Sequence, residues 1–323
     1  MIFKRLLQIA APIILAAAMS ACGTIKNDAI QGKTAPLAAH TAEASLPSSG
    51  KKYFGVYEQG VPKSYQPISE FADNIGQQPS IVLYYSAWYT PFQAQFAQTA
   101  YSHGAATLVQ IQPNGISLQS LVNGRYDHYL TSYADQVRAF GHPVLLSFGH
   151  EMNGTWYTWG AGHVAPSVFI AAWRHVVSLF RAAGADNVTW MWTVNSLTVA
   201  RGSLSEWWPG SAWVNWVGID GYYVHSSDTF QLVFGNTLNE IRSFTNKPVL
   251  ISETGAGPQP GQVTQIQDLF DSAQSDNLLG VVWFDQAQNN GIYHQDWRLE
   301  DSPDAMSAFR AGVKAFGPDL AHV

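Results

Sequence analysis

Residues 143–160 read PVLLSFGHEMNGTWYTWG, an apolar run that ends in a histidine, a glutamate and a cluster of aromatic side chains. The start of the run has the near-continuous apolar character of a parallel strand that is buried on both faces. A carboxylate at the end of such a strand is costly to bury unless it has a partner or a function. The stretch therefore predicts a buried strand over 143–151 whose carboxyl end presents a functional group, Glu151.

Seven further runs share this apolar, β-branched or aromatic character, at 53–58, 80–88, 106–112, 187–195, 216–223, 248–254 and 279–286. Amphipathic stretches typical of helices lie between several of them, at 126–140, 166–183, 229–244, 261–275 and 303–316. Strand and helix repeated eight times over about 270 residues predict a single-domain α/β fold, the (β/α)8 or TIM barrel. A doubly wound open sheet is the alternative, but no Gly-rich phosphate loop follows the first strand.

The composition has few charged and many aromatic residues, which favours an uncharged ligand such as a sugar. Only 12% of the 323 residues are charged, about half of the ~25% usual in globular proteins. The formal net charge of -6 argues against a nucleic-acid partner, which requires a basic surface. The chain also has 12 Trp, 14 Tyr and 16 Phe, which suit stacking on sugar rings or a large aromatic core.

The amino terminus has the pattern of an export signal. Lys4 and Arg5 precede an apolar segment over 6–18 that is shorter than the about 20 residues needed to span a bilayer. Met19-Ser20-Ala21-Cys22 then resembles a lipobox, in which the cysteine is lipidated and becomes the mature amino terminus. We therefore expect a lipoprotein signal peptide over 1–22. An ordinary signal peptide cut near Ala21 is the alternative.

Residues 23–51 are rich in Ala, Ser, Thr and Gly without sustained periodicity, so we expect a flexible tether. Cys22 is the single cysteine, which excludes an intrachain disulfide. These segments predict an exported monomer, anchored by lipid at a bacterial outer membrane or cell surface, with its catalytic domain over 52–323.

The active site of such a barrel lies at the carboxyl ends of its strands. Every predicted strand carries polar or aromatic residues in its carboxyl-terminal part: Glu58, Trp88, Gln110, Gln112, His150, Glu151, Asn195, Asp220, Tyr222, Glu253, Trp283 and Asp285. Glu151 and Glu253 stand out because each closes a strongly apolar strand, the fourth and the seventh. Side chains from strands three apart project across the mouth of the barrel.

Two carboxyl groups that face each other across a sugar-sized opening can hydrolyse a glycosidic bond. A separation of about 5–5.5 Å would let one attack the anomeric carbon while the other protonates the leaving oxygen, with net retention. Two like charges this close disfavour double ionisation, so one carboxyl keeps a proton near neutral pH and acts as the acid.

Other hydrolytic chemistries are not supported. An HExxH zinc helix requires a second histidine four residues after His150, where this chain has Gly154, and the preceding stretch is strand-like. A serine hydrolase of the Gly-x-Ser-x-Gly type lacks its pentapeptide. We therefore expect neither a metal nor an organic cofactor.

HEMNGTWYTWG resembles the acid/base motif of glycoside hydrolase family 26, and WVGIDGYY and PVLISETGA resemble its sixth- and seventh-strand segments. The likeness spans residues from about 52 to 318. It implies a (β/α)8 barrel with catalytic glutamates on strands four and seven, Glu151 as general acid/base and Glu253 as nucleophile. The family includes enzymes that cleave β-mannan, mixed-linkage β-glucan and β-1,3-xylan.

The resemblance also implies substrate-binding residues. His150 would form a hydrogen bond on the nucleophile side, and Tyr222 would bond the nucleophile. Trp156 would border the subsite beside the acid, with Trp159 as a further wall, and Trp283 would form the floor under the cleaved sugar. Asp220 matches the other member of the sixth-strand pair. Gln110 and Gln112 stand where mannanases of the family often have a histidine.

These residues predict a retaining, endo-acting β-glycanase whose substrate is β-1,4-mannan, mixed-linkage glucan or β-1,4-glucan. A catalytically silent, carbohydrate-binding envelope lipoprotein is the alternative on the same barrel. A purely structural envelope protein is the third possibility, and it predicts no saturable oligosaccharide binding.

Overall fold

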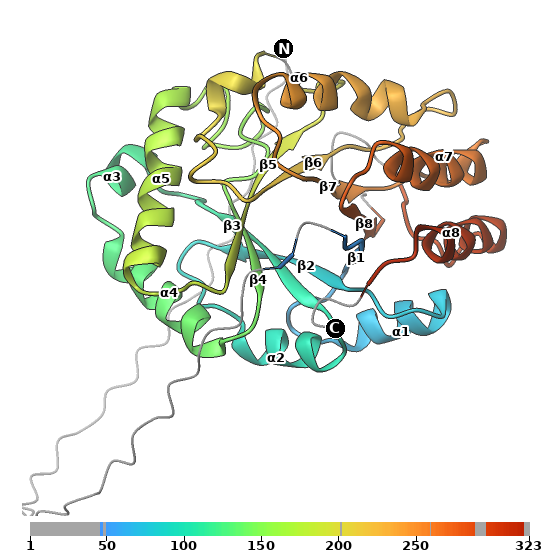
Figure 1. Cartoon of the computed structure of the whole chain (residues 1–323), viewed down its shortest axis with the longest axis horizontal. Coiled ribbons are helices and arrows are strands. Elements are labelled where there is room, and N and C mark those ends of the chain that lie inside the picture. The colour runs from blue at the N-terminus through green and yellow to red at the C-terminus, as the bar shows by residue number, and fades with distance from the viewer. Residues whose placement is uncertain (1–45, 48–49, 201, 259, 288–294, 320–323) are drawn as a thin grey trace, which may run out of the picture. The chain divides into compact units, whose positions relative to one another are not determined.

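Eight parallel strands form a closed barrel in the computed structural model, which describes residues 46–47, 50–200, 202–258, 260–287 and 295–319 (Figure 1). Their bounds are β1 Tyr53–Glu58, β2 Ile81–Ala87, β3 Ala106–Gln112, β4 Val144–Phe148, β5 Val188–Asn195, β6 Trp216–Asp220, β7 Val249–Thr254 and β8 Gly280–Asp285. Each strand pairs with its sequence neighbours, and β1 closes the barrel on β8 over its whole length. The predicted (β/α)8 fold is confirmed.

Helices connect the strands and surround them in Figure 1. They are α1 Gln66–Ile75, α2 Ala94–Ser102, α3 Leu118–Val122, α4 Asp127–Phe140, α5 Pro166–Ala182, η1 Leu204–Trp207, η2 Gln231–Gly235, α6 Asn236–Phe244, α7 Gln262–Ser275 and α8 Pro303–Phe316. Pro166 and Pro303 begin their helices at the first turn, where the missing N–H costs nothing. Among the described residues, no helix has the length and apolar character needed to cross a membrane.

Alternate side chains of the strands point into the barrel and pack in layers. The layer nearest the amino ends of the strands is an apolar cluster of Leu46, Tyr53, Ile81, Leu83, Ala106, Leu108, Leu145, Met191, Trp216, Leu250, Leu279 and Val282. The other strand side chains pack against the helices in a larger apolar core. Polar side chains occupy the carboxyl ends of the strands, which we call the catalytic rim.

The folded domain begins earlier than the predicted boundary at residue 52. Leu46 is 4% exposed and packs into the apolar cluster, and its backbone N–H donates to Thr189 Oγ1 at 3.0 Å. The hydroxyl of Tyr53 donates to the carbonyl of Pro47 at 2.6 Å. The end of the predicted tether over 23–51 therefore belongs to the barrel. The predicted signal peptide and Cys22 lie outside the described residues.

Candidate active site

A β-bulge in β7 brings Glu253 into the barrel mouth. The pairing of β7 shifts by one residue between Ile251 and Thr254 relative to β8, and a matching shift occurs against β6. A bulge inserts one residue and re-aims the neighbouring side chains. Ser252 and Glu253, although adjacent in sequence, consequently both reach polar partners on the inner side of the barrel. Ser252 donates to Asp220 at 2.6 Å, and Glu253 binds two tyrosine side chains.

Two tyrosine hydroxyl groups hold the carboxyl group of Glu253. Tyr85 of β2 donates to Oε1 at 2.5 Å, and Tyr222, which follows β6, donates to Oε2 at 2.8 Å. Glu253 is 5% exposed. Hydrogen bonds from two donors stabilise the ionised form of a carboxyl group that burial would otherwise neutralise. Tyr222 was predicted as a partner of this glutamate, and Tyr85 was not.

Glu151 reaches the same mouth from β4 through an unusual backbone. The strand ends at Phe148, three residues earlier than Glu151, and both Gly149 and Glu151 have positive φ angles, of 58° and 55°. The backbone N–H of Glu151 donates to the carbonyl of Thr193 at 2.9 Å, which fixes this turn against β5. A positive φ at a glutamate is strained and is typical of active sites.

Two N–H donors bind the carboxyl group of Glu151. Asn195 Nδ2 donates to Oε1 at 2.7 Å from the end of β5, and Trp156 Nε1 donates to Oε2 at 2.7 Å. The backbone of Asn195 is itself tied to Asn153 through two hydrogen bonds. Trp156 is 36% exposed, whereas Glu151 is 8% exposed, so the tryptophan that binds the buried carboxyl group is itself accessible at the rim. Trp156 thus lies beside the acid, and the sugar subsite that it would border stays a prediction.

Burial and mutual repulsion disfavour two charges in this site. Burial, followed by the charge on Glu151, raises the pKa of Glu253 to about 8, against the effect of its two phenol donors. Burial also raises the pKa of Glu151, and the bonds from Asn195 and Trp156 oppose this rise. Asp220 lies fully buried beside them, and burial and the two glutamates raise its pKa well above its usual value. The arrangement favours one proton shared by the catalytic pair.

His150 does not contact the nucleophile, contrary to the prediction. Its Nε2 lies 3.2 Å from the hydroxyl of Tyr157, and its ring is 5.6 Å from the ring of Tyr85, which takes the expected position on Glu253. Burial lowers the pKa of His150 to about 3, so the imidazole is neutral. In this structure His150 therefore contacts Tyr157 rather than the nucleophile.

Trp159 is a supporting residue rather than a wall of the substrate cleft. It is 1% exposed, stacks on Tyr157 with ring centroids 4.3 Å apart, and donates from Nε1 to the carbonyl of His150 at 2.8 Å. A side chain this deeply buried cannot stack on a sugar. The predicted role in substrate binding is wrong, and Trp159 instead fixes the backbone that precedes Glu151.

Trp283 is likewise placed differently from the prediction. Its neighbours Val282 and Phe284 belong to the clusters inside the barrel, so Trp283 points outward, where its ring lies 5.0 Å from Phe309 of α8. Trp283 is fully buried and cannot form a floor under a sugar. Its indole N–H donates to the carbonyl of Trp297 at 3.0 Å.

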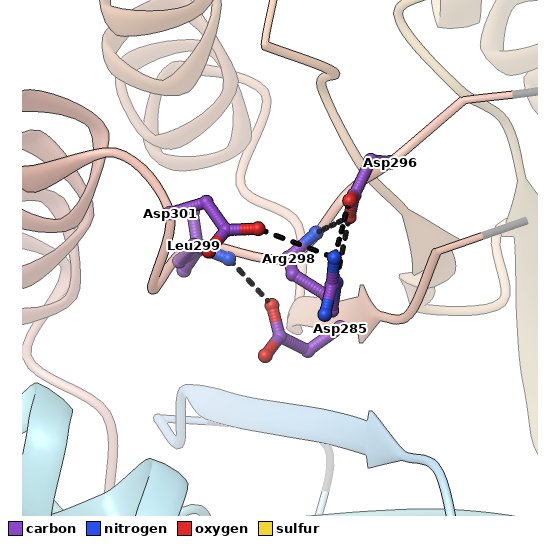
Figure 2. A network of polar contacts seen from close by, with 5 residues as sticks. All are labelled: Asp285, Asp296, Arg298, Leu299 and Asp301. Atoms are coloured by element: carbon purple, nitrogen blue, oxygen red, sulfur yellow. Dashed lines mark hydrogen bonds and ion pairs between the residues drawn. The ribbon is translucent and has the colours of Figure 1, made fainter.

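Trp297 supports Tyr222 through ring stacking. Their rings stack with centroids 4.2 Å apart, and Trp297 is fully buried. Figure 2 shows how the adjoining segment is fastened: Arg298 binds the carboxylates of Asp296 at 2.6 Å and Asp301 at 3.2 Å. The segment after β8 thereby holds the phenol that binds the nucleophile.

The two glutamines of β3 occupy different depths. Gln110 is fully buried next to Tyr85 and Ser147 in the strand register, and its amide has no hydrogen-bond partner among the described residues. Gln112 is half-buried at the rim, and Asn114 Nδ2 donates to its Oε1 at 3.2 Å. Gln112 is thus the better placed of the two to contact a ligand.

Comparisons with known proteins bear on the family of this chain. A family model described as Glycosyl hydrolase family 26 matches residues 67–299. Endoglucanase H of Acetivibrio thermocellus is 30% identical over 273 residues, which cover 79% of this chain and 30% of that protein. A mannan endo-1,4-beta-mannosidase of Bacillus subtilis (strain 168) is 26% identical over 201 residues, which cover 56% of this chain and 52% of that protein. The chain thus spans about a third to a half of these relatives.

A solved structure shares the fold. The GH26 beta-mannanase from Bacteroides ovatus superposes with a TM-score of 0.62 at 14% identity, covering 84% of this chain and 91% of that one. The family match over most of the barrel confirms the resemblance inferred from the HEMNG motif. This chain belongs to glycosyl hydrolase family 26.

Proposed function

We propose that this protein is an endo-acting β-glycanase that cleaves β-1,4-mannan, mixed-linkage glucan or β-1,4-glucan with retention of configuration. The observation that carries the proposal is the buried pair of Glu151 and Glu253 on the catalytic rim, each held by two hydrogen-bond donors. Endoglucanase H and the Bacillus subtilis mannosidase support this class of activity through their names.

The proposed reaction has two displacement steps. In the first, ionised Glu253 attacks the anomeric carbon while Glu151 gives its proton to the departing glycosidic oxygen. This step forms a glycosyl ester on Glu253 and releases the shortened chain. In the second step, Glu151 takes a proton from water, whose oxygen attacks the anomeric carbon and returns Glu253 to its carboxylate form.

The side chains around the pair serve these steps in different ways. The hydroxyl groups of Tyr85 and Tyr222 favour the ionised nucleophile. The N–H groups of Asn195 and Trp156 favour the ionised form of Glu151, which is required as the base in the second step. Burial raises the pKa of Glu151 and so favours the proton that this residue needs in the first step.

A glycan screen on the full chain tests this function. Release of reducing ends from mannan, mixed-linkage glucan, cellulose or xylan identifies the substrate and contradicts the silent lipoprotein, which binds sugars without cleaving them. Replacing Glu151 by Gln should lower turnover about 100- to 10,000-fold without unfolding, because general acid–base catalysis is lost. Full activity of both Glu151→Gln and Glu253→Gln on the identified glycan would refute the assignment.

The stereochemistry and the role of Trp156 need separate measurements. Proton NMR of the first products should show the β anomer, as retention requires, whereas an initial α anomer contradicts double displacement.

Trp156→Phe removes the indole N–H that lies 2.7 Å from Glu151 but keeps a ring at the partly exposed position. We expect a lower kcat with little change in the melting temperature.

We also propose that Cys22 carries the lipid anchor that holds the enzyme at the cell envelope. The motif Met19-Ser20-Ala21-Cys22 after an apolar segment supports the proposal. Metabolic labelling with a fatty acid should mark the full chain, and Cys22→Ser should lose the label and leave the membrane fraction. Labelling that persists in Cys22→Ser contradicts this anchor.

A further inference from the structure

A second strained residue lies on the catalytic rim. Among the described residues, three other than glycine have a positive φ angle: Tyr89 at 67°, Glu151 at 55° and Asn277 at 53°. Asparagine adopts this conformation readily, so Asn277 needs no special reason. Glu151 belongs to the catalytic pair. Tyr89 remains as a bulky aromatic residue in a backbone conformation that favours glycine.

Tyr89 follows the strand that supplies a partner of the nucleophile. It lies four residues after Tyr85, whose hydroxyl binds Glu253, and the N–H of Thr90 donates to the carbonyl of Ala87 at 3.0 Å to close the intervening turn. Four residues of extended chain span at most about 14 Å, so Tyr89 lies within a few sugar units of the catalytic centre. It therefore stands on the same rim as the catalytic pair.

The ring of Tyr89 is unusually open for an aromatic side chain in this protein. It is 63% exposed, whereas most of the aromatic rings are buried. Trp88, Tyr126 and Tyr129 contact it at centroid distances of 5.4 to 6.2 Å and interplanar angles of 62° to 68°. These neighbours hold the ring in place, and none of them is stacked parallel to it.

We propose that Tyr89 is a distal sugar-binding platform, on which a pyranose ring of the bound polysaccharide stacks several units away from the cleaved bond. The turn itself would be satisfied by glycine, so its geometry does not explain the tyrosine. Aromatic rings bind the apolar faces of sugars, and an exposed ring held by its neighbours loses little entropy on binding. The inference rests on the proposed glycanase function and adds a determinant of preference for long chains.

Kinetics on substrates of graded length test the platform. The full chain and its Tyr89→Gly and Tyr89→Phe variants are compared on manno- and mixed-linkage gluco-oligosaccharides from tri- to hexasaccharide. Tyr89→Gly should lower kcat/KM on the longest substrates about 3- to 10-fold and leave the trisaccharide unchanged, as expected for one lost stacking contact. Tyr89→Phe should retain the preference for length. Leu232→Ala, at another exposed apolar residue, is the matched control.

The melting temperature separates binding from a structural role. Tyr89→Gly should melt close to the parent, because relief of strain at the positive φ angle offsets the loss of the ring contacts with its aromatic neighbours. An equal loss on all lengths together with a lower melting temperature overturns the proposal, and so does an unchanged length profile. Calorimetric titration of hexasaccharides into Glu253→Gln, with and without Tyr89→Gly, distinguishes the two proposals. Weaker binding with Tyr89→Gly supports the platform even if the parent cleaves nothing, and equal binding overturns it.

Discussion

Removing one of the two tyrosine hydroxyl groups that bind Glu253 is the sharpest test of how this site works. Tyr85→Phe and Tyr222→Phe each delete one hydroxyl group, which lies 2.5 or 2.8 Å from the carboxyl oxygens. The rings stay in place because Tyr85 packs against Tyr57 and Tyr222 stacks on Trp297. Each substitution therefore removes one hydrogen bond to the nucleophile.

The size and sign of the effect follow from the charge that each phenol stabilises. A hydrogen bond to a charged group contributes about 1.5–3 kcal/mol, and one pKa unit corresponds to about 1.4 kcal/mol. Each hydroxyl favours ionised Glu253, so its loss should raise a pKa that already stands at about 8 by a further 1–2 units or so. The acid limb of the profile of kcat/KM against pH should move to higher pH, with a lower maximum.

The measurement is the initial rate of reducing-end release across the pH range in which the protein stays folded. Tyr53→Phe is the control, because its hydroxyl binds the carbonyl of Pro47 at the opposite end of the barrel and contacts neither glutamate. That variant should lose some stability and keep the parent's profile. Profiles of Tyr85→Phe and Tyr222→Phe that coincide with the parent's, or move to lower pH, would refute the reasoning.

Three further variants test the packing and electrostatics around the site. Trp159→Ala should lower the free energy of unfolding in urea by about 3–5 kcal/mol, because it empties a fully buried aromatic position. A decrease below about 1 kcal/mol would contradict that packing. Gly218→Ala should cost about 1–3 kcal/mol, since its new Cβ would lie 2.6 Å from Ser252 Oγ, and an unchanged thermal melt argues against this close contact. Burial and the neighbouring Asp285 raise the pKa of Glu58 to about 10, so stability should fall as the pH rises from about 4.5 through 10. Glu58→Gln should make that fall in melting temperature shallower, and an equally steep fall would count against the buried neutral carboxyl.

Much of the fold was predictable because it depends on local pattern. Apolar runs separated by amphipathic stretches specify parallel strands covered by helices, and the strand ends then identify the rim. The same alternation also encodes which strand side chains point into the barrel. Ile81, Leu83 and Tyr85 are alternate residues of one strand, so the third should also point inward. By the same parity, Trp283 should point outward between two inward residues.

Other features depend on contacts that no local pattern encodes. The bulge that admits Glu253 arises from pairing with β6 and β8, strands that lie about 30 residues away in the sequence. The direction of the Glu151 side chain results from positive φ angles at Gly149 and at Glu151 itself, which the pattern of a strand does not reveal. Trp297 supports Tyr222 through a segment without strand or helix periodicity.

The surroundings of Glu151 suit a residue that must act first as an acid and then as a base. Its N–H donors favour the carboxylate, whereas a charge on Glu253 favours the protonated form. While Glu253 is charged, its repulsion favours a proton on Glu151, which the first displacement needs. Formation of the glycosyl ester removes that charge, and with it the repulsion. The N–H donors of Asn195 and Trp156 then dominate, and they favour the carboxylate that activates water. In the proposed mechanism Glu151 therefore changes its protonation preference without moving, because the switch is the charge of its partner across the barrel mouth.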